Sequence, residues 1–304
     1  MPLGAGMTAP RRIIKNTTYL ITRRCFGRLF LLRPSELSNW VFEYRLAVAA
    51  ERYGIRLHAY CVLSNHWHCV LTDPLGKLPK FEQDLDSIIA RALNAAHGRW
   101  ESFWAPGSYS AVVLSTPADI VDKMAYVLAN PVAAGLVRRG AEWPGLWSAP
   151  SRIGAGPKVV RRPEHFFRRK GRAPEVALLE LVRPPGFESD EELRSLLQAA
   201  LAQREDQAAR DLAEQGRSFL GARKALSQKP LARPAPDEPR RHLNPRVAGR
   251  DKWKRIEALG QLKDFLADYR EAWRAFKGGA RSTVFPEGTY RMRVTYGVAC
   301  GAAV

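Results

Sequence analysis

The triplet His66-Trp67-His68 is the stretch of this chain whose residue types and spacing best suit metal chemistry. An apolar run follows it, another precedes the turn-forming pair Ser64-Asn65, and together these features predict two short strands joined tightly. Side chains alternate between the faces of a strand, so both imidazoles would share one face while Trp67 packs against the other. Two imidazoles on one face can bind a divalent metal ion. The alternative is a pair of ordinary polar residues on a solvated sheet face.

A phenol and an amide follow in the segment 118–137. Apolar residues recur there at helical spacing, and Asp119 stands near the expected helix start. Proline disfavours helix at the residue before it, so Pro131 predicts that the helix ends near Asn130. Tyr126 and Asn130 would then lie one turn apart on the same helix face. Taken alone, this pairing is also compatible with chance.

Together the two segments resemble the HUH single-tyrosine transposases, specifically the REP-associated tyrosine transposase group. The matching residues are Tyr60, the stretch 64–68 and the stretch 126–137. Their order and approximate spacing are those of the family's histidine strand and tyrosine helix. The resemblance covers residues 10–150, and the joint match is far more specific than either motif alone.

This resemblance implies a metal-dependent transposase that cleaves and rejoins single-stranded DNA at hairpin or repeat sites. His66 and His68 correspond to the family's metal ligands, and Asn130 occupies the place of the third ligand. Tyr126 corresponds to the nucleophile, which attacks a scissile phosphate and leaves a 5′-phosphotyrosine link and a free 3′-hydroxyl. The implied cofactor is Mg²⁺ or Mn²⁺, the implied substrate is single-stranded or hairpin DNA, and the implied assembly is a homodimer.

The chemistry suits these residue types. A phenol has a pKa near ~10, so at neutral pH it needs help to act as a nucleophile. A Lewis-acid metal lowers the barrier by stabilising charge on the phosphate oxygens. Two imidazoles and an amide make a weak site for Mg²⁺, and by ligand type alone they suit zinc or manganese better.

Two positions depart from the family pattern. Trp67 is larger than the small aliphatic residue usually found between the histidines, and Leu63-Ser64 replaces the usual Met-Pro. Neither departure removes a ligand residue. We interpret them as marks of a divergent subgroup with a repacked core behind the histidine strand.

The chain of 304 residues carries a formal net charge of +18, which indicates a polyanionic partner. Charge alone leaves ribosomal, membrane-surface and general nucleic-acid roles open, whereas charge and motifs together favour nucleic acid. The four cysteines form no CxxC pair, the apolar runs are too short to span a membrane, and the N-terminus lacks a secretory signal. We therefore expect a cytoplasmic, nucleoid-associated protein without membrane contact.

Periodicity predicts helices over 35–53 and 78–98, and strands over 13–26, 55–63 and 109–115. With the histidine strand and the tyrosine helix, this order fits an α+β fold. We predict a split βαβ (ferredoxin- or RRM-like) antiparallel sheet with helices on one face, which is also the family's fold.

Three arginines, Arg23, Arg24 and Arg28, stand at the end of the first predicted strand. We interpret them as DNA-binding residues that hold phosphates. A solvated strand end is an equally simple alternative.

We predict a catalytic domain over residues 10–150 and a basic, mainly helical extension over 151–304. The two segments carry net charges of +6 for residues 1–150 and +12 for residues 151–304. Helical patterns run over 190–228 and 252–276, and the tail 284–300 reads as one or two strands. We hypothesise that the extension helps to recognise a DNA hairpin or flanking duplex.

Two classes of function remain to be weighed. The first is an active transposase, and the second is a domesticated, non-cleaving protein that binds repeat DNA. The presence of His66, His68, Tyr126 and Asn130 favours the first, because a pure binding protein need not keep all four. A replication initiator or relaxase of the wider HUH class would share the chemistry, but the helix motif around Tyr126 points away from it.

Overall fold

A computed structural model describes residues 10–107, 109–164, 171, 173–234, 245–249 and 251–301. The predicted extension is therefore described in part. The first half contains β1 (Thr17–Arg24), α1 (Glu36–Tyr53), β2 (Arg56–Val62), β3 (His66–Asp73), α2 (Leu78–Ala96), β4 (Ser110–Leu114) and α3 (Pro117–Ala133). The second contains β5 (Lys158–Arg161), β6 (Val176–Leu179), α4 (Asp190–Glu214), α5 (Ala222–Leu226), β7 (Val247–Ala248), α6 (Lys252–Lys277) and α7 (Arg291–Tyr296).

The strands of the first half form one sheet in the order β2-β3-β1-β4, which β7 extends at one edge. All neighbouring pairs are antiparallel except β4 and β7, which are parallel. The fold is therefore α+β with a mainly antiparallel sheet, as the sequence predicted. In the register of β1 and β3, Thr22 lies opposite His68 and Arg24 lies opposite His66.

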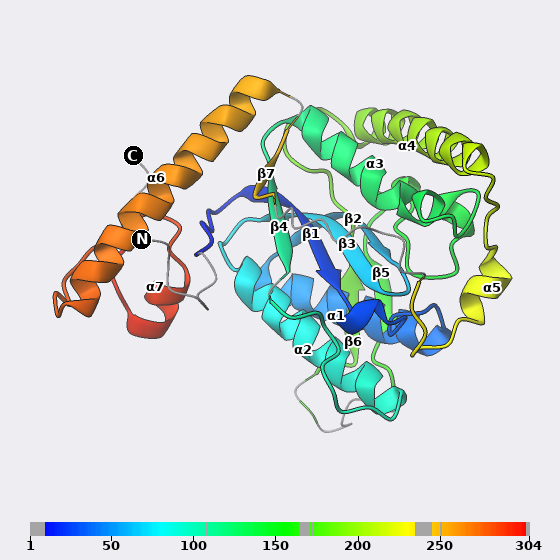
Figure 1. Cartoon of the computed structure of the whole chain (residues 1–304), viewed down its shortest axis with the longest axis horizontal. Coiled ribbons are helices and arrows are strands. Elements are labelled where there is room, and N and C mark those ends of the chain that lie inside the picture. Colours follow the sequence, from blue (N-terminus) through cyan, green and yellow to red (C-terminus); the bar gives the residue numbers. More distant parts are fainter. Residues whose placement is uncertain are drawn as a thin grey trace.

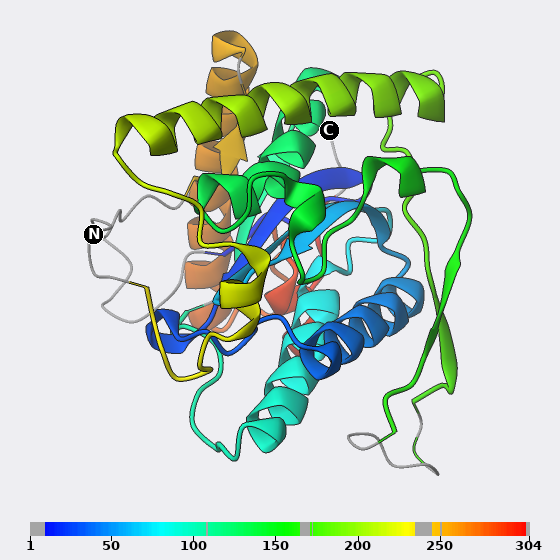
Figure 2. The same cartoon turned by 90° about the vertical axis from the view of Figure 1, so that its right-hand side faces the viewer.

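Helices cover both faces of this sheet (Figures 1 and 2). On one face Trp67 packs edge-on against Phe42 of α1, with ring centroids 5.5 Å apart. On the other face the ring of His68 packs against the ring of Tyr126 of α3, with centroids 5.4 Å apart. The prediction of helices on one face is therefore wrong for α3. The reason lies in β3, which is buried at seven consecutive positions and so needs cover on both sides.

Helix α3 begins as the sequence predicted and ends later. The Thr116 hydroxyl accepts a hydrogen bond from the backbone N–H of Asp119, which caps the first turn. The helix then runs through Pro131 to Ala133, beyond the predicted end near Asn130. A proline this close to the end sacrifices few helical hydrogen bonds, and Gly135 closes the helix in the left-handed conformation at φ 68°.

The core of the sheet includes side chains from both sides of residue 150, among them Leu193 and Leu197 of α4. Two elements of the second half were not predicted, the hairpin β5–β6 and the short strand β7. A separate apolar cluster joins α6 and α7 through Ala272, Phe285 and Met292. The prediction of one or two strands over 284–300 is wrong, because this segment forms α7 and two isolated bridges, Phe285 with Cys300 and Thr289 with Arg12.

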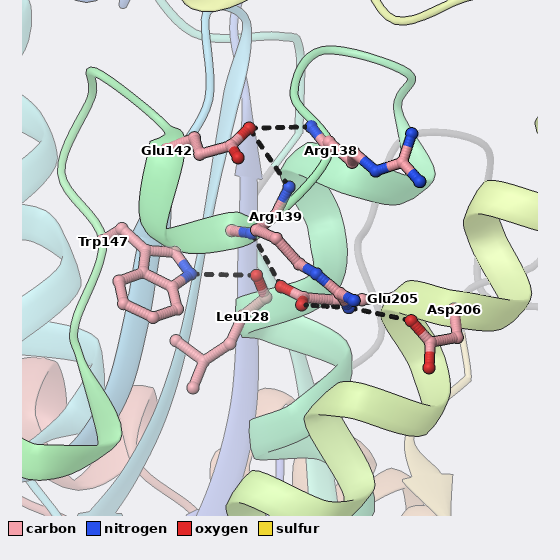
Figure 3. A network of polar contacts seen from close by, with 8 residues as sticks. Leu128, Arg138, Arg139, Glu142, Trp147, Glu205 and Asp206 are labelled. Atoms are coloured by element: carbon pink, nitrogen blue, oxygen red, sulfur yellow. Dashed lines mark hydrogen bonds and ion pairs between the residues drawn. The ribbon is translucent and has the colours of Figure 1, made fainter.

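A polar network fixes the loop after α3 against α4 (Figure 3). Glu205 of α4 is buried, accepts the backbone N–H of Gly140 at 2.7 Å and pairs with Arg139 at 3.3 Å. Arg139 also pairs with the exposed Asp206 at 2.8 Å. The Trp147 indole N–H donates to the carbonyl of Leu128 in α3 at 2.9 Å. These bonds hold α4 in a fixed position beside α3.

Replacing Glu205 by Ala should lower the free energy of unfolding by about 1–3 kcal/mol, because Gly140 then keeps a buried N–H without an acceptor. The matched change Asp206→Ala should cost less than about 1 kcal/mol, since that ion pair is exposed to solvent. Urea denaturation of both variants measures the difference. Equal losses in the two variants would contradict the assigned role of Glu205.

Candidate metal and nucleophile site

Both histidines of the triplet lie on the same face of β3, as strand alternation requires. Their ring centroids are 4.8 Å apart, with the ring planes perpendicular. His68 is buried, whereas His66 keeps part of its surface exposed. Trp67 is fully buried on the opposite face. The two imidazoles therefore form a pair that opens toward α3.

Neighbouring polar groups orient each imidazole through its Nδ1 atom. His66 Nδ1 donates to Asn65 Oδ1 at 2.6 Å, and the Asn65 amide nitrogen donates to the carbonyl of Arg28 at 3.4 Å, which fixes the amide. His68 Nδ1 bonds to the hydroxyl of Thr22 on β1 at 2.7 Å. Because an amide oxygen only accepts, the lone pair of His66 lies on Nε2, and His68 Nε2 carries its lone pair when Nδ1 donates to the Thr22 hydroxyl, the arrangement that metal-binding histidines need.

Both imidazoles are held neutral. Burial, reinforced by the charge of Arg24, lowers the pKa of His66 to about 4. Burial, with the neighbouring His66 and Arg24 as further causes, lowers the pKa of His68 well below its usual range. At neutral pH the pair therefore offers lone pairs rather than positive charge, so a cation can approach it without first displacing protons.

Tyr126 and Asn130 reach the histidine pair from α3. The Tyr126 ring packs edge-on against His68, and 37% of this side chain remains exposed. The Asn130 side chain lies within hydrogen-bonding reach of His66, and its amide nitrogen donates to the carbonyl of Tyr126 at 3.2 Å. The structure thus brings together four residues that the sequence singled out from two distant segments.

This arrangement fits a divalent cation. In the described part of the chain, His68 Nε2 is buried and has no hydrogen-bond partner, which is costly for a polar atom that serves only packing. Within the same residues, no group of three or more His, Cys, Asp or Glu side chains is arranged as a metal site. The donors present are therefore two imidazole nitrogens and one amide oxygen, a set that leaves further coordination positions for phosphate or water.

The three arginines predicted to bind DNA separate into two groups. Arg23 points to the opposite face of the sheet, where it pairs with Asp86 of α2 at 3.1 Å and donates to the carbonyl of Gly107. Arg24 is exposed beside His66, and the charges of Arg24 and Arg28 both act on that imidazole. Only Arg24 and Arg28 are therefore placed to meet a substrate at the histidine pair.

Sequence reasoning missed several residues that shape the site. Thr22 could not be assigned because its role depends on the register between β1 and β3. Asp122 and Lys123 form an ion pair at 3.0 Å on the turn of α3 before Tyr126, and Lys123 Nζ lies 6.0 Å from the centre of the Tyr126 ring. Asp122 and Lys123 stand about one helical turn before Tyr126, and this spacing could have identified them from the sequence.

No protein-family model matches the chain, and no curated protein matches it. Two solved structures show a partial similarity. One is a REP-associated tyrosine transposase bound to a REP hairpin, at 21% identity over 46% of this chain and 81% of that chain, with a TM-score of 0.39. The other is a candidate transposase from Deinococcus radiodurans R1, at 22% identity over 36% of this chain and 87% of that chain, with a TM-score of 0.29. Similarity at this level supports no conclusion about function. The argument for function rests on the geometry of the site itself.

Within the described residues, no helix combines the length and the apolar character that crossing a membrane requires.

A third histidine, His58 of β2, makes the pH dependence of stability testable. His58 is buried, bonds to the carbonyl of Val182 and to Thr72, and burial lowers its pKa to about 4. The unfolded chain takes up a proton near pH 6.5 while the folded protein does not, so stability should fall as the pH drops from about 6.5 to 4.

Replacing His58 by Gln should make the free energy of unfolding less dependent on pH, by up to about 3 kcal/mol between pH 7 and pH 4. Urea denaturation at several pH values measures this difference. Nitrogen NMR of the His58 ring provides a control, because the ring should remain neutral at pH 5.5. Identical pH dependence in both proteins would contradict the assignment.

Proposed function

We propose that this protein is a metal-dependent transposase of the HUH single-tyrosine type, which cleaves and rejoins single-stranded DNA at hairpin or repeat sites. One observation carries the proposal. Two neutral imidazoles, an amide oxygen and a partly exposed phenol converge from β3 and α3 at one point. A protein that only binds DNA gains nothing from an enclosed His68 whose Nε2 atom has no hydrogen-bond partner.

His66 and His68 would hold a divalent cation, Mg²⁺ or Mn²⁺, through their Nε2 atoms, with Asn130 as the third ligand. When bound, the cation supplies Lewis-acid stabilisation of charge on a phosphate. Asn65 keeps His66 in the tautomer that can bind it, and Thr22 orients the ring of His68 and can accept from its Nδ1. These contacts pre-organise the site before substrate arrives.

Tyr126 would act as the nucleophile. Its oxygen forms a bond to phosphorus, the bond from phosphorus to the departing 3′-oxygen breaks, and that oxygen takes up a proton to give a free 3′-hydroxyl. The phenol proton passes to solvent, to which the Tyr126 side chain is open. The covalent 5′-phosphotyrosine conserves the phosphodiester bond energy, so the reverse attack by a 3′-hydroxyl rejoins the strand.

We assign DNA contacts to Arg24 and Arg28, which flank His66, and a structural role to Arg23, whose guanidinium pairs with Asp86. The chain's net charge of +18 supports a nucleic-acid partner. We further propose a homodimer in the cytoplasm, associated with the nucleoid, on the basis of the family resemblance.

We also propose a split βαβ architecture, because α1 and α2 connect the strands of the order β2-β3-β1-β4 in the sequence β-α-β-β-α-β. Residues 10–150 would form the catalytic domain, and residues 151–304 would form a basic extension that contacts DNA. Exposed Trp253 of α6, with Lys252 beside its ring, and exposed Tyr296 of α7 support this role for the described C-terminal residues 251–301.

Incubation with single-stranded DNA carrying the repeats that flank the gene, plus Mn²⁺ or Mg²⁺, should give a covalent protein–DNA adduct on denaturing gels. The adduct should require the metal and should be absent in Tyr126→Phe, because phenylalanine lacks the attacking oxygen. The matched control Tyr53→Phe removes a phenol at the end of α1 and should leave the adduct unchanged.

The same assay tests the other assignments. A chain that ends at residue 250 should still form the adduct with an unstructured strand but should lose its preference for a hairpin substrate. Tight hairpin binding by the intact protein without any adduct, with either metal, would contradict the proposed activity and would favour a non-cleaving protein that binds repeat DNA.

A further inference from the structure

A groove of about 920 Å³ runs between α3 and α4, and Tyr126 forms part of its wall. Small side chains from both helices give it a narrow apolar floor, including Ala129, Ala133 and Ala199. Leu196 of α4 also lines the groove and is 47% exposed. The groove is thus continuous with the exposed side of the proposed nucleophile.

Beside Tyr126, which lies between the two ends of the α3 wall, two cations surround one carboxylate. Asp122 is buried, pairs with Arg204 of α4 at 2.6 Å and pairs with Lys123 at 3.0 Å. Two cations therefore share one carboxylate, and both are partly exposed. An approaching anion can bind these cations without any requirement to neutralise Asp122.

The groove also contains hydrogen-bonding groups away from this charge. Gln203 lines it on the turn before Gln207, whose amide is already bonded to Asp211 and accepts from Arg210. Arg210, Asp211 and Glu192 belong to the lining as well, so the groove away from Tyr126 holds one guanidinium and two carboxylates. The excess of positive charge is therefore local to the two cations beside Tyr126, of which Arg204 lines the groove and Lys123 lies next to it.

We propose that this groove binds one unpaired nucleotide next to the scissile phosphate, with its base against the alanines and its phosphate on Lys123 and Arg204. This inference rests on the proposed function and adds a subsite that is built by α4, outside the region of family resemblance. The volume lies in the range of small-molecule sites, about 300–1,000 Å³, and apolar walls with a few polar groups suit a planar base. The two cations beside the nucleophile complement a phosphate.

A substitution that fills the groove tests this subsite. Ala199 is exposed and lines the groove, whereas its neighbour Gln198 is equally exposed and does not line it. Ala199→Trp should weaken binding of a single-stranded thymidine oligonucleotide at least tenfold, and Gln198→Trp should change it less than twofold. Fluorescence anisotropy with the full-length protein measures both affinities.

Two further measurements make the result decisive. Leu196→Glu places a negative charge in the groove and should weaken binding as Ala199→Trp does, whereas Gln198→Glu should not. An oligonucleotide of abasic residues should bind the intact protein more weakly and should be insensitive to Ala199→Trp. Unchanged affinity in Ala199→Trp and Leu196→Glu, with native melting curves, would overturn the subsite.

The binding readout separates this inference from the proposed activity. If the groove variants lose affinity while the intact protein forms no adduct, the nucleotide subsite stands and the transposase chemistry fails. If the intact protein forms the adduct and the groove variants bind normally, the chemistry stands and the subsite fails.

Discussion

The antiparallel register between β1 and β3 is the constraint on which the candidate site depends. It places Thr22 opposite His68 and Arg24 opposite His66, so that one strand supplies the hydrogen bond and the charge that act on the other strand's imidazoles. A slip of one residue would turn these side chains to the opposite face. The pairing is secured because both faces of β3 are buried, by α1 on the Trp67 side and by α3 on the histidine side.

Burial of β3 on both faces has a direct chemical consequence. It removes water from His66 and His68, which lowers the pKa of both imidazoles and leaves them neutral. A buried lone pair without a partner costs stability in the absence of a ligand. The unpaired His68 nitrogen therefore lowers the free energy of unfolding but stays available to a cation. The packing of Trp67 against Phe42 helps to compensate for this loss of stability.

Much of the site could be predicted from local patterns. Strand alternation gave the shared face of the histidines, and helical spacing gave the pairing of Tyr126 with Asn130. Alternation also requires Arg23 and Arg24 to point to opposite faces. The prediction that Arg23, Arg24 and Arg28 all bind DNA did not take this into account. The predicted end of α3 near Asn130 was wrong because proline was taken to terminate the helix. In the folded protein Pro131 is buried inside α3, and the helix continues past it.

Contacts between distant parts of the chain could not be predicted in this way. The pairing of Asp122 with Arg204 joins α3 to a helix whose position depends on the Glu205 network and on burial of Leu193 and Leu197. The tail over 284–300 reads as strand because its apolar residues alternate, yet it folds into α7 since Met292 packs against Phe285 and Ala272 rather than beside a sheet edge.

Electron paramagnetic resonance of bound Mn²⁺ is the most direct test of the central claim that His66 and His68 form a metal site. With histidine labelled by ¹⁵N, the account predicts couplings from two imidazole nitrogens in the intact protein and weaker binding, with one coupling at most, in His68→Ala. Mn²⁺ that binds without nitrogen couplings, or that binds His68→Ala equally well, would contradict the account.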